Sequence, residues 1–509
     1  MEDISNLAKI VVDRRVGVPP LIDFSAKSSS NKEIELLQIL SSEQQATQLQ
    51  VTKVLYGKAN TTNQAALRKL KSRVQKKLLN HLYFLDHTDP RQFISKRYEL
   101  QCLELYHQAS ILFKESESEL AERLARKCLR LALDGEFTQY VVMSLGFLRH
   151  LYAQLRKPKH YRAISKQLKH YQEIAKTEEE ARQLYLDVRM EQTQTVRSRR
   201  FLLNELSAHI TTMESLHRKA NTYSAFEYLY RMRLMREELL GNFEEIIEIT
   251  GTTSVLFDKG KVNKKRFDIR FNKFMSVWAH LRSKQVVKGL ILAEDYIKDF
   301  HPSSDNWFYF LEHYMLLALH AKEYSKAYEI LRLARKNPYY SKQRAAAIQR
   351  WDLFEVYLHF IQPENSSLRL QFSQFIQTVP DYSRDKQGYN VAILVLQFLY
   401  YLRQGNLDAL LTRLEGLRKY EQNHLRDPAT LRSQLFFRLL LLMVREDFAP
   451  QACEKKGQTL LNRLREAPQP GDAYAESEII PYEDLWELTL NILRVNAEAR
   501  ATEEAAHER

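Results

Sequence analysis

Glycine and proline are both scarce in this chain, at 13 residues each out of 509. Folds built on glycine-rich phosphate loops and tight strand turns need more glycine, so the shortage favours helices joined by short connections. Cysteine is scarcer still, with only Cys102, Cys128 and Cys453. Because no two of them form a C-x-x-C pair, the sequence signals neither a disulfide framework nor a zinc site, and it suits a reducing compartment.

Long apolar runs are missing as well. No stretch approaches the roughly eighteen apolar residues of a membrane-spanning helix, and residues 1–17 hold no apolar run of signal-peptide length. We therefore expect a cytoplasmic protein. The hydrophobic fraction of 44% is still enough for a buried core and excludes wholesale disorder.

Motifs that carry catalytic chemistry are also missing. The chain has no G-x-x-x-x-G-K-[ST], G-x-G-x-x-G, G-x-S-x-G or H-E-x-x-H pattern. His150, His160 and His170 are ten residues apart, which places them on no common helix face. Most carboxylates lie within three or four residues of a basic residue, as on a solvated helix face, although two acids meeting across helices leave no sequence signal. We expect no enzymatic activity, cofactor or metal.

Basic residues outnumber acidic ones, with a net charge of +13. Such a charge favours an anionic partner: a nucleic acid, an acidic protein surface or a membrane face. A solvated surface without any specific partner explains the same number equally well.

Acidic residues are missing altogether from residues 44–85, within a predicted three-helix module spanning 31–88. The first helix covers 32–40, the second runs from about Glu43 to Tyr56 and ends at Gly57, and the third begins after residues 60–63 and runs to about Leu85. The third helix has an apolar stripe on one side. Its other faces carry the candidate contacts for nucleic acid or an acidic partner: Arg68, Lys69, Lys71, Arg73, Lys76 and Lys77.

The stretch ATQLQVTKVLYG, a polar loop and AALRKLKSRVQKKLL together resemble the helical part of a winged helix-turn-helix. The pattern is similar to the DNA-binding domain of bacterial transcriptional activators that also carry helical repeats, which implies DNA binding. One departure concerns Asp86 to Pro90, which leave no room for the β-hairpin wing. The alternative is a basic helical cap on the rest of the chain.

A second basic cluster lies in residues 259–273, KGKVNKKRFDIRFNK. Lys264, Lys265 and Arg266 are its candidate contact residues. Phe267, Phe271 and Phe274 recur at helical spacing, which fits either a surface that stacks on single-stranded nucleic acid or, more commonly, a buried core with solvated lysines.

Short turns followed by helices recur about every forty residues from residue 90 onward. The aromatic or aliphatic residue after each turn is Leu120, Tyr161, Phe201, Phe243, Val286, Tyr324, Leu368, Leu407 or Phe448. Residues 321–338 resemble the second half of a tetratricopeptide repeat, with Tyr324, Ala327, Leu331, Ala334 and Pro338 at the matching spacing. We therefore predict an all-α fold: a right-handed superhelical solenoid of antiparallel helix hairpins with a period near forty.

The predicted organisation has five parts. An extended segment (1–30) precedes the basic module (31–88), which is followed by two halves of the array (89–240 and 241–495) and a flexible tail (496–509). Residues 159–240 contain no Gly or Pro and predict long helices, with starts at the capping boxes Thr177-x-x-Glu180 and Ser224-x-x-Glu227. Residues 431–446 are apolar nearly all round and predict a buried helix.

These observations predict a non-enzymatic scaffold or adaptor that binds a protein or peptide partner, with the basic charge favouring an acidic one. The alternative is a regulator that binds nucleic acid through the basic module. The sequence leaves the oligomeric state open.

Overall fold

The computed structural model describes residues 2–14, 21–24, 31–42, 47–85, 94–192, 196–362, 389–425, 430–468 and 478–507. Within these ranges every regular element is a helix and no strand occurs, which confirms the all-α class. The chain divides into two compact units. One comprises Met1–Leu131 with Ser144–Arg162, and the other comprises Ala132–Met143 with Ala163–Arg509. The boundary predicted at residue 240 therefore lies inside the second unit.

The first unit begins with a helix, α1 (Glu2–Arg14), where we predicted an extended segment. The reason is visible in Ile4, Leu7 and Val11, which recur at helical spacing. The amide of Asn6 donates a hydrogen bond of 3.1 Å to Glu117, which ties α1 to its own unit.

The predicted three-helix module is present. It consists of α2 (Lys32–Ser42), α3 (Gln48–Tyr56) and α4 (Thr61–His81), and a 3₁₀ turn (Leu82–Phe84) follows α4. A capping box between Thr47 and Gln50 starts α3, and Gly57 ends it with a φ of 78°, a backbone conformation that glycine adopts without strain. The module has its own core, formed by Ile22, Ile34, Leu36, Val51, Leu55, Leu67, Leu70 and Val74.

After α5 (Ile94–Lys114) come α6 (Ser118–Asp134), α7 (Thr138–Gln154) and the long helices α8 (Pro158–Gln192) and α9 (Val196–Ala220). The predicted helix start at Thr177 is wrong, because α8 runs straight through it and the Thr177 hydroxyl donates to the carbonyl of Glu173. The cap predicted at Ser224 is displaced by two residues: the N-cap of α10 (Tyr223–Leu240) is Thr222. Without Gly or Pro nothing stops α8, so a local capping pattern is overridden.

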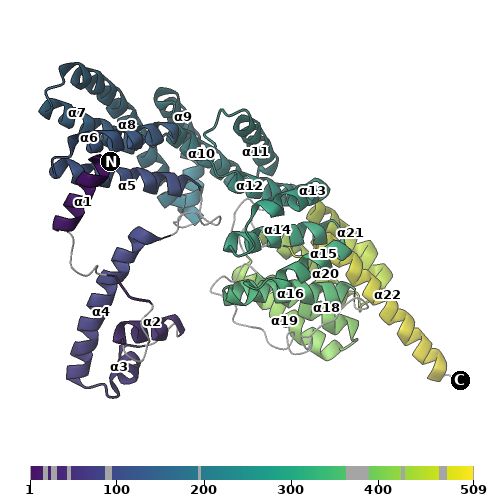
Figure 1. Ribbon diagram of the computed structural model, residues 1–509. Helices are drawn as coiled ribbons and strands as arrows, with labels where there is room; N and C mark the ends of the chain where they lie inside the picture. The colour runs from purple at the N-terminus through teal and green to yellow at the C-terminus, as the bar shows by residue number, and fades with distance from the viewer. Residues whose placement is uncertain are drawn as a thin grey trace. The chain divides into compact units, whose positions relative to one another are not determined.

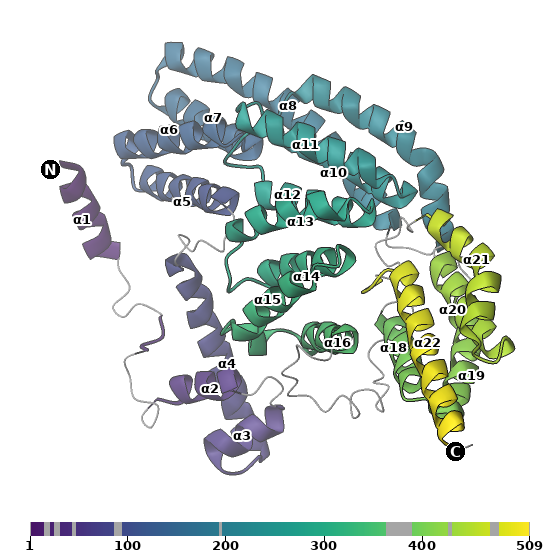
Figure 2. The same ribbon diagram turned by 90° about the vertical axis from the view of Figure 1, so that its right-hand side faces the viewer.

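The remaining helices of the second unit follow in chain order. They are α11 (Phe243–Asp258), α12 (Ile269–Arg282), α13 (Val286–Tyr296), α14 (Asp305–His320), α15 (Tyr324–Lys336), α16 (Ala345–Ile361), α18 (Tyr389–Arg403), α19 (Leu407–His424), α20 (Leu431–Arg445), α21 (Pro450–Glu466) and α22 (Tyr482–His507). Figures 1 and 2 both show α12 to α16 stacked in this order within the unit. α22 continues beyond Val495, through most of the predicted tail.

The same turn closes helix after helix. At the end of α14, Lys322 has a left-handed φ of 60°. The N–H groups of Lys322 and Glu323 donate to the carbonyls of Leu319 (3.2 Å) and Ala318 (2.9 Å), which the helix end would otherwise leave unpaired. Equivalent left-handed positions are occupied by Ser116, Glu136, Arg156, Gly241, Gly260, Lys284, Gly405 and Asp447.

The turn and helix predicted at residues 321–338 are confirmed in detail. α15 starts at Tyr324 and ends before Asn337, and Ala327 and Ala334 are completely buried against neighbouring helices. Small residues at these positions let helices approach closely. Around them lies the main core of the second unit, which extends from α12 to α22 and includes the fully buried Trp351 and Trp486.

Candidate functional site

The basic residues of α4 lie on the side of the helix that faces away from the module core. Leu67, Leu70 and Val74 are buried, whereas Arg68, Lys69, Lys71, Arg73 and Lys76 are exposed and Lys77 is half-buried. The helical period accounts for this separation, because residues three and four apart share a face. The basic residues therefore lie on the faces of α4 outside its buried apolar stripe, as the sequence predicts.

Two of these cations have a structural partner that the sequence did not reveal. The Glu33 carboxylate on α2 accepts from Nε of Arg73 at 2.7 Å and from Nζ of Lys77 at 2.8 Å. Burial alone would raise the pKa of Glu33, but Lys77 and Arg73 outweigh burial and the pKa is lowered. The acid that balances this acid-free helix lies forty residues upstream, so only tertiary structure shows it.

Arg68, Lys69 and Lys76 form the outward face of α4 together with Ser72. Within the part of the chain that the structure describes, none of the three cations makes an ion pair. α3 and α4 are joined through residues 57–60. We predicted that Asp86 to Pro90 leave no room for a β-hairpin wing after α4. These residues lie outside the described ranges.

The second basic cluster has a different environment. Arg266 donates from Nη1 to the carbonyl of Glu136 at 2.8 Å, and its guanidinium lies 4.7 Å from the ring centres of both Phe137 and Tyr223. Lys265 forms an ion pair with Asp134. These cations bind the C-terminal end of α6, where carbonyls and the helix dipole attract positive charge.

Lys264 and the phenylalanines complete this cluster. Nζ of Lys264 donates to the carbonyl of Asp258 at 3.2 Å and lies 5.5 Å from the ring of Phe257. Phe267 is buried in a core shared by α10, α11 and α12, and Phe271 and Phe274 pack against that core. The phenylalanines therefore occupy the core position that we weighed against a stacking surface.

A groove opens between α19, α20 and α21. α19 packs mainly on α18, and α20 packs mainly on α21, so α19 and α20 meet less closely. The space between them has a volume of about 990 Å³. Its apolar lining is formed by Leu414, Leu425, Leu441, Leu442, Val444 and Leu460.

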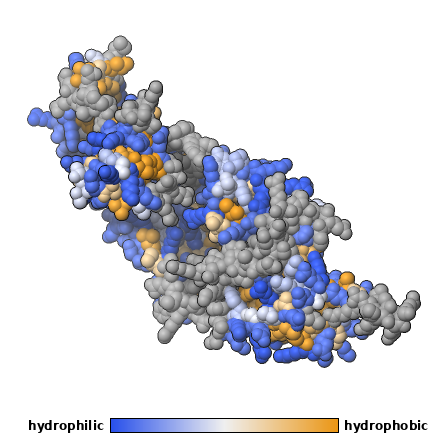
Figure 3. All heavy atoms as spheres, turned by 90° about the horizontal axis from the view of Figure 1, so that it is seen from below, coloured by the Kyte–Doolittle hydropathy of each residue, from blue (hydrophilic) through white to orange (hydrophobic). Residues whose placement is uncertain are grey.

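This groove explains why α20 is apolar nearly all round. Leu435, Phe436, Leu439 and Leu440 are buried in the core. Leu441, Leu442 and Val444, which sequence reasoning also placed in the core, are half-buried and line the groove. On the face drawn in Figure 3, hydrophobic residues form separate small patches between hydrophilic ones.

The rim of the groove is positively charged. Arg418, Arg438 and Arg445 line it together with a single acid, Glu421. Glu421 lies 3.7 Å from Arg438, which leaves Arg418 and Arg445 with no ion-pair partner in the described ranges. The groove thus joins an apolar floor to a net positive rim.

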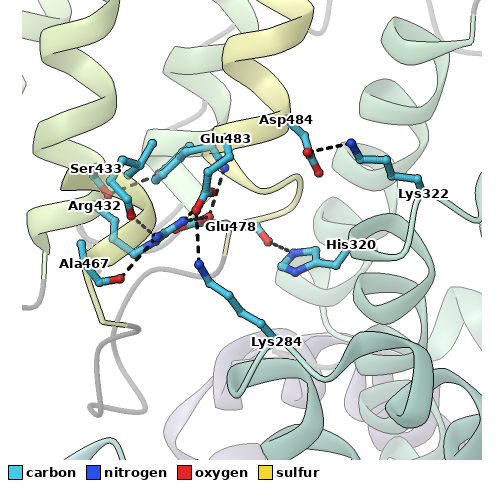
Figure 4. A network of polar contacts seen from close by, with 11 residues as sticks. Lys284, His320, Lys322, Arg432, Ser433, Ala467, Glu478, Glu483 and Asp484 are labelled. Atoms are coloured by element: carbon cyan, nitrogen blue, oxygen red, sulfur yellow. Dashed lines mark hydrogen bonds and ion pairs between the residues drawn. The ribbon is translucent and has the colours of Figure 1, made fainter. Parts of the chain in front are cut away.

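Two acids of the segment at the start of α22 meet around a buried arginine. Figure 4 shows Arg432 of α20 between Glu478 and Glu483. Nη2 of Arg432 donates to Glu478 at 3.0 Å and to Glu483 at 2.7 Å, and Nη1 donates to the carbonyl of Leu464 at 2.6 Å. Burial lowers the pKa of Arg432, but the two carboxylates raise it more. The guanidinium therefore stays charged.

The same segment also contacts the turns after α12 and α14. Lys284 donates to Glu483 at 3.2 Å, and Lys322 pairs with Asp484 at 2.9 Å. Nε2 of His320 donates to the carbonyl of Glu478 at 2.7 Å. We call residues 478–484 with Arg432, Lys284 and Lys322 the charged clamp. Its acids are neutralised by bases, so its geometry indicates a structural role.

Metal binding finds no support over the residues described: no group of three or more His, Cys, Asp or Glu side chains there is arranged to hold an ion. None of the helices, as far as they are described, is long and apolar enough to cross a membrane. No family model, curated protein or solved structure matches the chain.

Proposed function

We propose that the chain is a non-enzymatic helical-repeat adaptor whose groove between α19, α20 and α21 binds an acidic amphipathic helix of a partner protein. The observation that carries this proposal is the groove itself, with its leucine floor and its arginine rim. An amphipathic helix places apolar side chains into such a floor at positions i, i+3, i+4 and i+7, and its acidic residues reach the rim.

The dimensions suit this occupant. A helix about 10 Å wide with a pitch of about 5.4 Å occupies roughly 400 Å³ per turn. The groove of about 990 Å³ therefore holds about two turns. The paired acid Glu421 adds one negative charge, so acidic residues of the partner meet Arg418 and Arg445 first.

The repeat architecture rests on the recurring turn. Apart from Gly260, which ends α11, its left-handed residues from α10 onward include Gly241, Lys284, Lys322, Gly405 and Asp447. They are spaced by about forty residues, or by about twice that across residues 363–388, where the turn predicted at Leu368 lies outside the described residues. This spacing supports a solenoid with a period near forty.

The test measures peptide binding by fluorescence anisotropy with the full chain. The probe is a labelled 16-residue helix of Leu and Glu with leucines at i, i+3, i+4 and i+7. Arg418→Glu with Arg445→Glu should weaken binding at least about tenfold, because two rim ion pairs, each worth up to about 1 kcal/mol, become repulsions. Lys419→Glu with Lys455→Glu, exposed residues outside the groove, is the matched control.

Two results would reject the adaptor proposal. One is that the Arg418 and Arg445 variant binds the acidic helix as tightly as the unchanged chain does. The other is that a helix with Lys in place of every Glu binds equally well, which would show that the rim charge selects nothing.

A second function is favoured by the outward face of α4. Arg68, Lys69 and Lys76 have no ion-pair partner among the residues described, and an exposed helix with unpaired cations binds phosphate groups. We propose nucleic-acid binding as this alternative. Arg68→Glu, Lys69→Glu and Lys76→Glu together should abolish the binding of a 20-base-pair DNA duplex. Undiminished binding would exclude α4 as the interface.

A further inference from the structure

A second cavity lies in the second unit, far along the chain from the arginine-rimmed groove. It has a volume of about 720 Å³ and is lined by the end of α9, by α10 and α11, and by residues 261–263. Its floor is aromatic and aliphatic. Phe226 and Tyr230 stack with ring centres 6.1 Å apart, and Leu229, Ile249 and Leu256 continue the apolar surface. We call this cavity the α10–α11 groove.

The charges of the α10–α11 groove are mostly negative. Glu245 and Glu248 lie one turn apart on α11, are exposed, and have no ion-pair partner in the portion of the chain described. Arg233 is already paired with Glu214 at 2.6 Å. Lys261 is the one remaining unpaired cation of the lining over the described residues, and it lies in the loop after α11.

Two further groups define the inner wall. The carboxylate of Glu136 accepts from the backbone N–H of Tyr223 at 2.6 Å and from the amide of Asn263 at 2.9 Å, so it links the start of α10 to the loop after α11. Nδ1 of His217 is buried and has no hydrogen-bond partner within the described ranges. Burial, with Arg233 nearby, lowers the pKa of His217. The imidazole therefore adds no positive charge at neutral pH, and it offers one unsatisfied polar atom to an occupant.

We propose that the α10–α11 groove binds a cationic, apolar segment of a partner protein, with Lys or Arg side chains between Glu245 and Glu248. The carboxylates of the lining attract a cationic side chain. The apolar floor favours a cation that carries an apolar stem. Lys and Arg bury their alkyl stems along apolar surface and keep the charged end at the rim. Such side chains cover Phe226 and Ile249 while their charges reach the two carboxylates. Nucleic acid is disfavoured by the same carboxylates.

This site goes beyond the adaptor proposal because it has the opposite charge and uses different helices. Together the two grooves give one chain the means to hold an acidic and a basic segment at separate places. The two can be tested separately, since no lining residue is shared between them.

The experiment measures binding of a fluorescein-labelled octapeptide of alternating Leu and Arg to the full chain, with an octapeptide of alternating Leu and Glu for comparison. Glu245→Gln with Glu248→Gln should weaken Leu/Arg binding about tenfold and leave binding of the acidic 16-residue helix unchanged. Glu244→Gln, an exposed acid on the same helix that does not line this groove, is the matched control and should change binding less than twofold.

A second variant tests the groove and not only its charge. Thr252 is exposed and lines the cavity, so Thr252→Trp places a large ring in it, whereas Gly251→Ala adds a methyl group where nothing lies within 4 Å. We expect at least a tenfold loss with Trp and no loss with Ala, at unchanged circular dichroism. Leu/Arg binding that survives both the double Gln variant and Thr252→Trp, or Leu/Glu binding of equal strength, would overturn the proposal.

Discussion

Helix α4 and residues 264–266 carry similar runs of basic residues, yet their side chains have different surroundings. Arg266 and Lys265 contact the end of α6 through a carbonyl, two aromatic rings and a carboxylate. On α4, Arg73 and Lys77 share Glu33, whereas Arg68, Lys69 and Lys76 have no ion-pair partner in the described chain. The density of basic residues is similar in the two places, but Lys265 and Arg266 have partners within the chain, whereas three cations of α4 have no ion-pair partner in the described ranges.

The difference teaches that a basic cluster is informative only after its intramolecular partners are known. A cation that already satisfies a helix end contributes to stability, and changing it should destabilise the region. A cation without a partner contributes little to stability, and changing it should alter binding alone. Stability measurements therefore separate the two groups of cations.

Arg432 is the extreme case of a cation with a structural partner. Arg432→Met leaves the carboxylate of Glu478 buried without its guanidinium, and breaking a buried ion pair in this way costs about 3–5 kcal/mol. We expect the free energy of opening around α20 and α22, measured by hydrogen exchange, to fall by that amount. Lys284→Gln, which removes a half-exposed partner of Glu483, is the control and should cost below about 1 kcal/mol. Equal losses in the two variants would contradict the assignment of Arg432 as the centre of the charged clamp.

Arg266 should show an intermediate loss. Arg266→Ala removes the hydrogen bond to the carbonyl of Glu136 and the contacts with Phe137 and Tyr223, and we expect a loss of about 2 kcal/mol in the opening free energy of α6 and α10. Lys264→Ala, in the same loop, should cost below about 0.5 kcal/mol because its side chain is exposed. If Arg266→Ala were as mild as Lys264→Ala, the contrast between the two basic clusters would fail.

The sequence predicted helix ends well where a residue at the end itself favours the turn. Gly57 and Gly241 mark helix ends because glycine adopts positive φ without strain. The same left-handed turn also occurs at Glu136, Arg156 and Lys322, where no glycine occupies the left-handed position, so glycine alone does not locate every turn. Thr177 shows the converse, since a good capping pattern lies in the middle of α8.

Functional geometry was predicted only in part. The outward basic face of α4 follows from a helical period and was foreseen, whereas its balance with Glu33 depends on how α2 packs on α4. The arginine-rimmed groove depends on a gap between α19 and α20. No residue pattern predicts a space between two helices. An apolar helix such as α20 has the same sequence pattern whether its face packs in the core or lines a groove.

Glu33 offers a test of the paired half of α4. Glu33→Gln removes the ion pairs to Arg73 and Lys77, and we expect a loss of about 1 kcal/mol in the opening free energy of α2 and α4 at pH 7, since Arg73 is largely exposed. The pKa of Glu33 is lowered in the folded chain, so its contribution is present above the usual value of 4.5 and is lost as the pH falls through the folded pKa. The difference between the two proteins should therefore shrink below about pH 4.5. A difference that stays constant from pH 7 to pH 3 would show that the charge of Glu33 is not involved.

The smallest stability effect is expected at the outward face of α4. Arg68→Gln, Lys69→Gln and Lys76→Gln together should change the opening free energy of α4 by less than about 0.5 kcal/mol, because exposed cations without partners stabilise little. If α4 binds duplex DNA, the slope of log affinity against log salt concentration should become shallower by roughly 2.7, at about 0.9 per lost phosphate contact. The matched triple variant Lys264→Gln, Lys265→Gln and Arg266→Gln should do the reverse, lowering stability and leaving the slope unchanged. If the triple variant of α4 destabilised the module, its three cations would have a structural role like those of residues 264–266. There would then be no reason to regard α4 as a binding surface.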